Sequence, residues 1–189
     1  MTSSKIVLCG LFLLAACQQQ MRDQPKYKPL APSTFFKDGR SSRHLVPGTV
    51  ARGYLKTDAH LYTGTVNGNV ADTFPFPVTR EILKRGQERY NIFCSPCHDH
   101  IGTGRGMIVQ RGFQPPPSFH IERLRQAPVG HFFSAVTNGF GAMYSYASRI
   151  PPRDRWAIIA YIRALQLSQR ATLADVPVEA RQQLLESTP

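Results

Sequence analysis

Two cysteines and a histidine near the middle of the chain are the residues best placed to do chemistry. The stretch Phe93-Cys94-Ser95-Pro96-Cys97-His98 sets two thiols three positions apart, with an imidazole directly after the second. Such a pair can form a redox-active disulfide, supply half of a zinc site, or hold a haem through two thioether bonds. The chain contains 4 cysteines, so the roles of Cys9 and Cys17 bear on the choice.

The histidine that follows the pair favours haem. Cys-x-x-Cys-His is the attachment motif of c-type haem, because one helical turn brings both thiols to one porphyrin edge and lets His98 bind the iron. A redox dithiol would need a preceding strand and a βαβ pattern. A zinc site would need two further ligands, and His98 directly after Cys97 makes joint ligation awkward. A lone disulfide would leave His98 without a role. We therefore predict one covalent haem c on Cys94, Cys97 and His98.

The N-terminus carries a processing signal. Lys5 supplies a positive charge, and Ile6–Ala16 is an apolar run of 11 residues, short of the ~20 needed to span a bilayer. The following Leu14-Ala15-Ala16-Cys17 resembles the lipobox of bacterial lipoproteins, in which the cysteine becomes the lipidated first residue. We expect a lipoprotein signal peptide over residues 1–16 and a lipid on Cys17, with an ordinary secretory signal as the alternative. Only Cys94 and Cys97 then remain for chemistry.

The chain is strongly basic, with a formal charge of +11. Removal of residues 1–16 loses only Lys5 and leaves a charge of +10. This balance favours acidic partners or an anionic membrane surface. Nucleic acid is another usual partner of basic proteins, but export argues against it, so we expect no nucleic-acid binding.

Residues 18–77 show little hydrophobic period and many turn signals, which predict a mostly irregular segment. Short strands are expected around Thr49–Tyr54 and Leu61–Val66. A segment of this length is either a linker or a strap bound to another surface. Its aromatic residues favour the strap, since a plain flexible linker would hold few: Tyr27, Phe35, Phe36, Tyr54, Tyr62, Phe74 and Phe76.

Helical periodicity begins at Thr79, which can cap a helix that runs to about Phe93. Gly86 lies on the apolar stripe of this helix, a position that predicts the close crossing of another helix. A second helix is expected between Pro128 and Gly139. A third, from about Pro152 to Leu167, is apolar on both sides and must be covered on both sides. The tail is polar, with a possible short amphipathic turn at 178–185.

The spacing Gly86-x-x-x-Tyr90-x-x-x-Cys94-x-x-Cys97-His98, with Trp156 and Tyr161 on a late helix, resembles class I cytochrome c over about residues 78–168. The resemblance implies an all-α domain whose first and last helices cross at the glycine. It also implies a sixth iron ligand from a methionine in the loop before the last helix.

Met143 stands at the place of that methionine, although Met-Tyr replaces the usual Met-Pro. Met107 is the competitor, but it follows His98 too closely to reach the opposite face easily. Further candidates are the histidines His100, His120 and His131. By the same resemblance, the carbonyl of Pro115 or Pro116 would accept a hydrogen bond from the other ring nitrogen of His98.

Ligation by His98 and Met143 would leave no open iron position, so we expect an electron-transfer protein rather than an enzyme. Over the mature chain, four stretches resemble the monohaem cytochrome c subunit of bacterial alternative complex III, a quinol oxidoreductase: residues 46–53, 74–79, 85–90 and 154–157. The resemblance implies multihaem cytochrome, iron–sulfur and integral membrane subunits as partners. It also implies a soluble cytochrome or terminal oxidase as acceptor, and a lipid-anchored place on the periplasmic side of the cytoplasmic membrane.

The expected organisation has four parts. A signal peptide at 1–16 precedes a lipid-anchored extended segment at 17–77 that docks on partner subunits, a cytochrome c domain at 78–170 and a polar tail at 171–189. The principal alternative is a stand-alone lipoprotein shuttle, or the cytochrome c subunit of another respiratory or dehydrogenase complex. A haem with a vacant site, as in a peroxidase module, is the second alternative.

Overall fold

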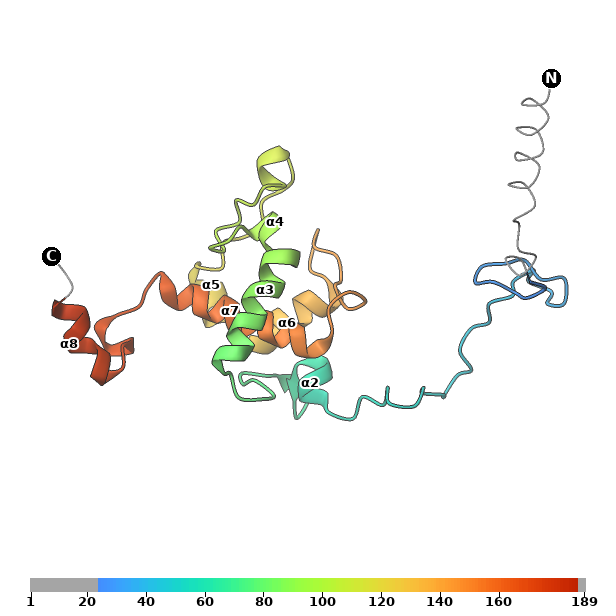
Figure 1. Cartoon of the computed structure of the whole chain (residues 1–189), viewed down its shortest axis with the longest axis horizontal. Helices are drawn as coiled ribbons and strands as arrows, with labels where there is room; N and C mark the ends of the chain where they lie inside the picture. The colour runs from blue at the N-terminus through green and yellow to red at the C-terminus, as the bar shows by residue number, and fades with distance from the viewer. Residues whose placement is uncertain (1–23, 187–189) are drawn as a thin grey trace, which may run out of the picture. The chain divides into compact units, whose positions relative to one another are not determined.

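The computed structural model describes residues 24–186 of the chain, so the predicted signal peptide and Cys17 lie outside the described residues. The chain divides between Tyr54 and Leu55 into two compact units. The helices of the second unit are drawn in Figure 1. Among the described residues, no helix has the length and apolar character required to cross a bilayer.

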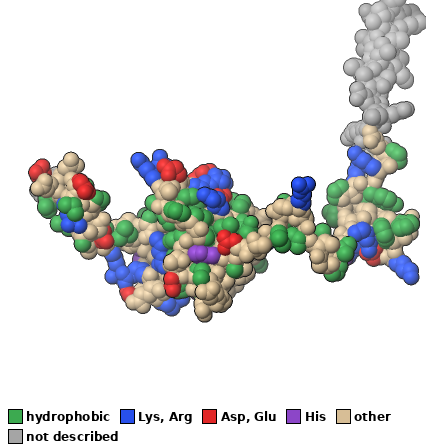
Figure 2. All heavy atoms as spheres, turned by 90° about the horizontal axis from the view of Figure 1, so that it is seen from below, with side chains coloured by type: hydrophobic (Ala, Val, Ile, Leu, Met, Phe, Trp, Pro, Cys, Tyr) green, Lys and Arg blue, Asp and Glu red, His purple; other side chains and the backbone are tan. Residues whose placement is uncertain are grey.

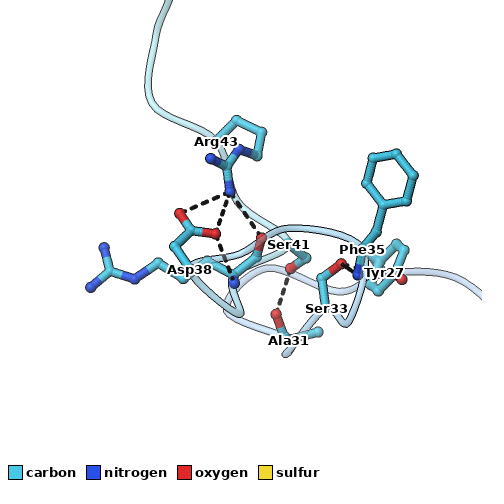
Figure 3. A network of polar contacts seen from close by, with 8 residues as sticks. Tyr27, Ala31, Ser33, Phe35, Asp38, Ser41 and Arg43 are labelled. Atoms are coloured by element: carbon cyan, nitrogen blue, oxygen red, sulfur yellow. Dashed lines mark hydrogen bonds and ion pairs between the residues drawn. The ribbon is translucent and has the colours of Figure 1, made fainter.

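The described part of the first unit, residues 24–54, is a folded loop whose only strand-like contact is one bridge between Pro32 and Arg40. Arg43 closes the loop, because it pairs with Asp38 at 2.8 Å and lies 4.1 Å above the ring of Phe36. Figure 3 shows the bonds from Arg43 to Asp38. The strand predicted at Thr49–Tyr54 is wrong: this stretch turns instead.

The second unit begins with a short helix, α2 (Ala59–Thr63), and a hairpin of β1 (Thr65–Val66) and β2 (Asn69–Val70). Asp58 caps α2 through the backbone amide of Leu61 at 3.1 Å, so a helix replaces the first half of the strand predicted at 61–66, and β1 forms at its end.

This N-terminal part of the second unit packs on the helices that follow. The indole of Trp156 donates to the carbonyl of Leu61 at 3.0 Å, and Gly130 donates to that of Ala71 at 2.8 Å. Residues 59–76 are therefore part of the helical unit and not an extended strap.

Two helices cross at the glycine, as the sequence predicted. Helix α3 (Arg80–Phe93) begins at the predicted cap Thr79, and α7 (Pro152–Ser168) lies across it (Figure 1). A Cβ on Gly86 would lie 2.0 Å from the carbonyl oxygen of Ala157, so only glycine permits this approach. Arg85 and Asp154 join the two helices by an ion pair at 2.8 Å.

Helix α7 is covered on its other side by α6 (Val129–Asn138), and the short α5 (Glu122–Gln126) precedes α6. The rings of Trp156 and Phe133 stack at 4.6 Å between α7 and α6. After α7 come a 3-10 turn (Leu173–Asp175) and α8 (Val178–Glu186), both without buried residues. The predicted helices are confirmed, and the fold is all-α after an irregular N-terminal segment. The core comprises Tyr90, Phe119, Leu124, Phe132, Phe133, Ile150, Trp156, Ile158, Ile159, Ile162 and Leu165.

Candidate haem-binding site

One helical turn carries the two cysteines and the histidine. Cys94 ends α3, where its amide donates to Tyr90 at 2.8 Å, and α4 (Ser95–His98) follows without a break. The amides of Cys97 and His98 both donate to the carbonyl of Cys94, at 3.1 and 2.9 Å. Both cysteines are free thiols. The fold therefore presents two thiols and an imidazole on a single turn.

The thiol of Cys94 differs from the reactive thiol of a redox dithiol. Burial, and next the neighbouring Cys97, raise the pKa of Cys94 to about 12. Reactive Cys-x-x-Cys pairs have the opposite shift, since they need a thiolate near neutral pH. Within residues 24–186, no three His, Cys, Asp or Glu side chains gather as a metal site, so a zinc site lacks its further ligands.

The imidazole of His98 is held as a neutral ring. Its Nδ1 is enclosed and has no hydrogen-bond partner among the described residues. The ring stacks on that of Phe119, with centroids 4.5 Å apart and 12° between planes. Burial lowers the pKa of His98 to about 4, against the opposing charge of Asp99. A neutral ring with an unused nitrogen is the form that binds a metal, so these residues fit a haem iron.

The predicted hydrogen bond from His98 to Pro115 or Pro116 is absent. The carbonyl of Pro116 faces the backbone of Gly104 instead, where a Cβ would lie 2.3 Å from its oxygen. The segment with Pro116 therefore packs closely on the glycine-rich loop that follows His98.

Asp99 clamps the loop after the histidine, a role that the sequence analysis missed. With φ of 59°, Asp99 turns its carboxylate toward the backbone amides of Ile101, Gly102, Thr103 and Arg105 at 2.7–3.2 Å. Partial burial raises its pKa, but the hydrogen bonds from Thr103, Arg105 and Ile101 outweigh burial and lower the pKa to about 2. An aspartate directly before a glycine-rich run was the available signal.

The loop clamped by Asp99 packs tightly against residues 94–98, the turn that carries the two cysteines and His98 (the cysteine turn). The hydroxyl of Tyr90 donates to the carbonyl of Asp99 at 2.8 Å. A Cβ on Gly106 would lie 2.2 Å from the carbonyl oxygen of Pro96. The loop thus holds α4 from one side while α3 holds it from the other.

Met143 lies on the loop between α6 and α7. Phe140 and Met143 exchange backbone hydrogen bonds at 2.9 and 3.0 Å, which forms a tight turn. Gly139 enters that turn at φ of 86°, and a Cβ there would lie 2.7 Å from the Met143 carbonyl oxygen. Met143 is half-buried, whereas the competing Met107 is 61% exposed.

Tyr146 connects the Met143 loop to the cysteine turn. Its ring lies 6.4 Å from that of Phe93, edge to face. Burial raises the pKa of Tyr146, and the nearby thiols of Cys94 and Cys97 raise it further. The loop that carries Met143 therefore approaches the two cysteines, a proximity that no spacing in the sequence indicates.

The three other candidate histidines have partners of their own. His120 Nε2 lies 2.7 Å from the carbonyl oxygen of Ile101, and His100 Nδ1 lies 3.2 Å from Asn91 Oδ1. His131 packs edge-on against the ring of Phe132. The Nδ1 of His120 is buried without a hydrogen-bond partner among the described residues.

Comparison with known proteins agrees with this geometry. Residues 81–162 match the family model described as "Cytochrome C oxidase, cbb3-type, subunit III". No curated protein matches the chain.

Two solved structures are similar at low scores. One is a chain of the reducing HAO-like protein complex of Kuenenia stuttgartiensis, at 20% identity and TM-score 0.44 over 57% of this chain and 54% of that one. The other is cytochrome cL of Methylophaga aminisulfidivorans, at 20% identity and TM-score 0.41 over 73% of this chain and 85% of that one. These scores are too low to bear on function.

The family match covers α3, the cysteine turn, the Met143 loop and most of α7. The match supports a cytochrome c domain at residues 81–162, and a domain of this kind carries electrons and implies covalently bound haem c.

Proposed function

We propose that this protein is a monohaem cytochrome c in which Cys94 and Cys97 hold the haem and His98 and Met143 are the axial ligands. The observation that carries the proposal is the single turn that presents two free thiols and a neutral, unpaired imidazole. When bound, the haem supplies one-electron chemistry. The protein residues orient it, exclude water from its ligands and leave no iron position for a substrate.

The absorption spectrum and mass of the purified chain test this proposal. We expect one haem mass added to the polypeptide and a low-spin spectrum with the weak near-red band of methionine–iron ligation. A ferrous protein that binds carbon monoxide strongly without denaturant would instead favour an open site, as in a peroxidase module.

We also propose that the chain is anchored to the periplasmic side of the cytoplasmic membrane by lipid on Cys17. Residues 24–54 contain six Lys and Arg residues and one Asp, which gives a net charge of +5. This positive charge supports binding to an anionic membrane surface. Figure 2 shows basic and hydrophobic side chains together on this unit. Cys17→Ser should release the protein from membranes, and retention after a salt wash would show that lipid is not the sole anchor.

We further propose that the protein is a subunit of a quinol-oxidising complex of the alternative complex III type. It would carry electrons from a multihaem subunit toward a soluble cytochrome or a terminal oxidase. The support is the sequence resemblance over the four stretches named above, which include the α3–α7 ion-pair residues Arg85 and Asp154. Purification from membranes should bring multihaem and iron–sulfur subunits with it.

A stand-alone lipoprotein shuttle would be purified without such subunits. Protease treatment separates the two functions further. Residues 24–54 should resist digestion in a complex, and they should be cleaved early in a free shuttle.

A further inference from the structure

Helix α7 buries an arginine that has no acidic partner. Arg155 is only 5% exposed, yet among residues 24–186 no carboxylate forms an ion pair with it. Burial lowers its pKa. A buried charge is expensive unless every donor is used, and an apolar side chain would fill this place at lower cost. The cation therefore needs an explanation beyond packing.

All three nitrogen atoms of the Arg155 guanidinium donate to residues at the two ends of the loop between α6 and α7. Nε donates to the carbonyl of Ile150 at 2.8 Å, Nη1 to the hydroxyl of Thr137 at 2.7 Å and Nη2 to the carbonyl of Ala147 at 3.3 Å. The group also lies 5.4 Å from the ring centroid of Phe133. Charge-assisted bonds of this kind are about twice as strong as neutral ones.

These acceptors stand at the two ends of the segment that carries Met143. Thr137 belongs to the last turn of α6, while Ala147 and Ile150 precede α7. One side chain thus closes the neck of the loop, with Tyr146 donating to Val136 at 2.9 Å as a backbone tie beside it.

We propose that Arg155 is the positioning residue for the iron ligand Met143, because it holds both ends of the 138–150 loop in the ligating arrangement. This inference rests on the proposed ligation by Met143. Without the three bonds, the loop keeps its turn at Phe140–Met143, and its two ends are joined only by the bonds from Tyr146 to Val136 and from the Ser145 hydroxyl to the Thr137 carbonyl, so the position of the turn is less firmly fixed.

The same helix offers a matched control two turns further on. Arg163 donates to the carbonyls of Arg125, at 2.9 Å, and Ala127, and its guanidinium lies 5.1 Å from the ring centroid of Phe132. Burial lowers its pKa as well. Its acceptors are the carbonyls of Arg125 and Ala127 at the end of α5 and the side-chain oxygen of Gln166 on α7. All of them lie outside the Met143 loop, so loss of Arg163 should affect stability without loosening that loop.

The test compares Arg155→Gln, Arg155→Lys, Thr137→Val and Arg163→Gln in the haem-loaded full chain. In Arg155→Gln, amide exchange over residues 139–149 should be at least about tenfold faster. Its near-red band should be lost or weakened, and the ferrous protein should bind carbon monoxide. Arg155→Lys keeps the charge and one bond, and it should recover part of the band. Arg163→Gln should melt at a lower temperature with the wild-type band.

An Arg155→Gln protein with wild-type loop exchange and an intact band would overturn the inference, whatever its melting temperature. If that variant does not fold, Thr137→Val decides, because it removes one acceptor and should give a smaller change in the same two readouts. A wild-type chain without the band would overturn the proposed ligation and this inference together. A wild-type band that persists in Arg155→Gln would overturn the inference alone.

Discussion

The two sides of the site are held in place by different means. The cysteine turn and the loop after it, residues 94–106, are fixed by contacts between near neighbours: α-helical hydrogen bonds, the Asp99 carboxylate and close glycine packing. The Met143 loop is fixed from outside, by Arg155 on α7 and by the approach of Tyr146 to Phe93. A sequence motif therefore predicts the cysteine turn, whereas the position of the Met143 loop depends on how distant segments pack.

The largest expected effect is the loss of covalent haem attachment. Replacing Cys94 and Cys97 together by serine should abolish covalent haem, because both thioether bonds are lost. Mass spectrometry of the purified chain and the Soret absorption measure this. Cys17→Ser is the control and should retain the haem in full. A double variant with normal covalent haem would contradict the role of this turn.

Removal of the Met143 side chain alone should leave the haem attached and change only the ligation of its iron. Met143→Ala should lose the near-red band and lower the reduction potential, since methionine ligation raises it. Redox titration and absorption spectra measure both. Met107→Ala is the control, because the 61% exposed Met107 should be dispensable. An unchanged spectrum in Met143→Ala would move the ligand to Met107 or a histidine.

The α3–α7 crossing supports both sides, so a change there should affect them together. Gly86→Ala places a Cβ 2.0 Å from the carbonyl oxygen of Ala157. The helices must separate, and we expect the free energy of unfolding to fall by ~3 kcal/mol. Chemical denaturation monitored at the Soret band measures it. Lys84→Ala, on the exposed face of α3, should be within about 0.5 kcal/mol of wild type.

The smallest effect is expected from a change in the loop after the cysteine turn, within residues 94–106. Asp99→Asn replaces one accepting oxygen by an NH2 group that faces backbone amides. The free energy of unfolding should fall by ~1–2 kcal/mol, as measured by denaturant titration. The near-red band should persist, since the Met143 loop is held independently. Loss of that band in Asp99→Asn would show that the two sides are coupled.

The helices could be predicted because their signals are local. Thr79 caps α3 and Gly139 follows α6 where capping and helix-stop rules place them. The hairpin region failed for the opposite reason. A helix capped by Asp58 replaced the first half of a predicted strand, and the carbonyl of Leu61 in this helix accepts a hydrogen bond from the indole of Trp156, 95 positions away.

The sequence by itself determined the chemistry of the cysteine turn, because two thiols and an imidazole within one helical turn meet whatever the rest of the chain does. It also determined that two helices approach at Gly86, since only glycine admits so near a neighbour. Tertiary structure alone decided that His98 stacks on Phe119 and that Arg155 closes the Met143 loop. The ring stacking and the bond from Arg155 to Thr137 join residues 18 or more positions apart, and no local periodicity encodes such a separation.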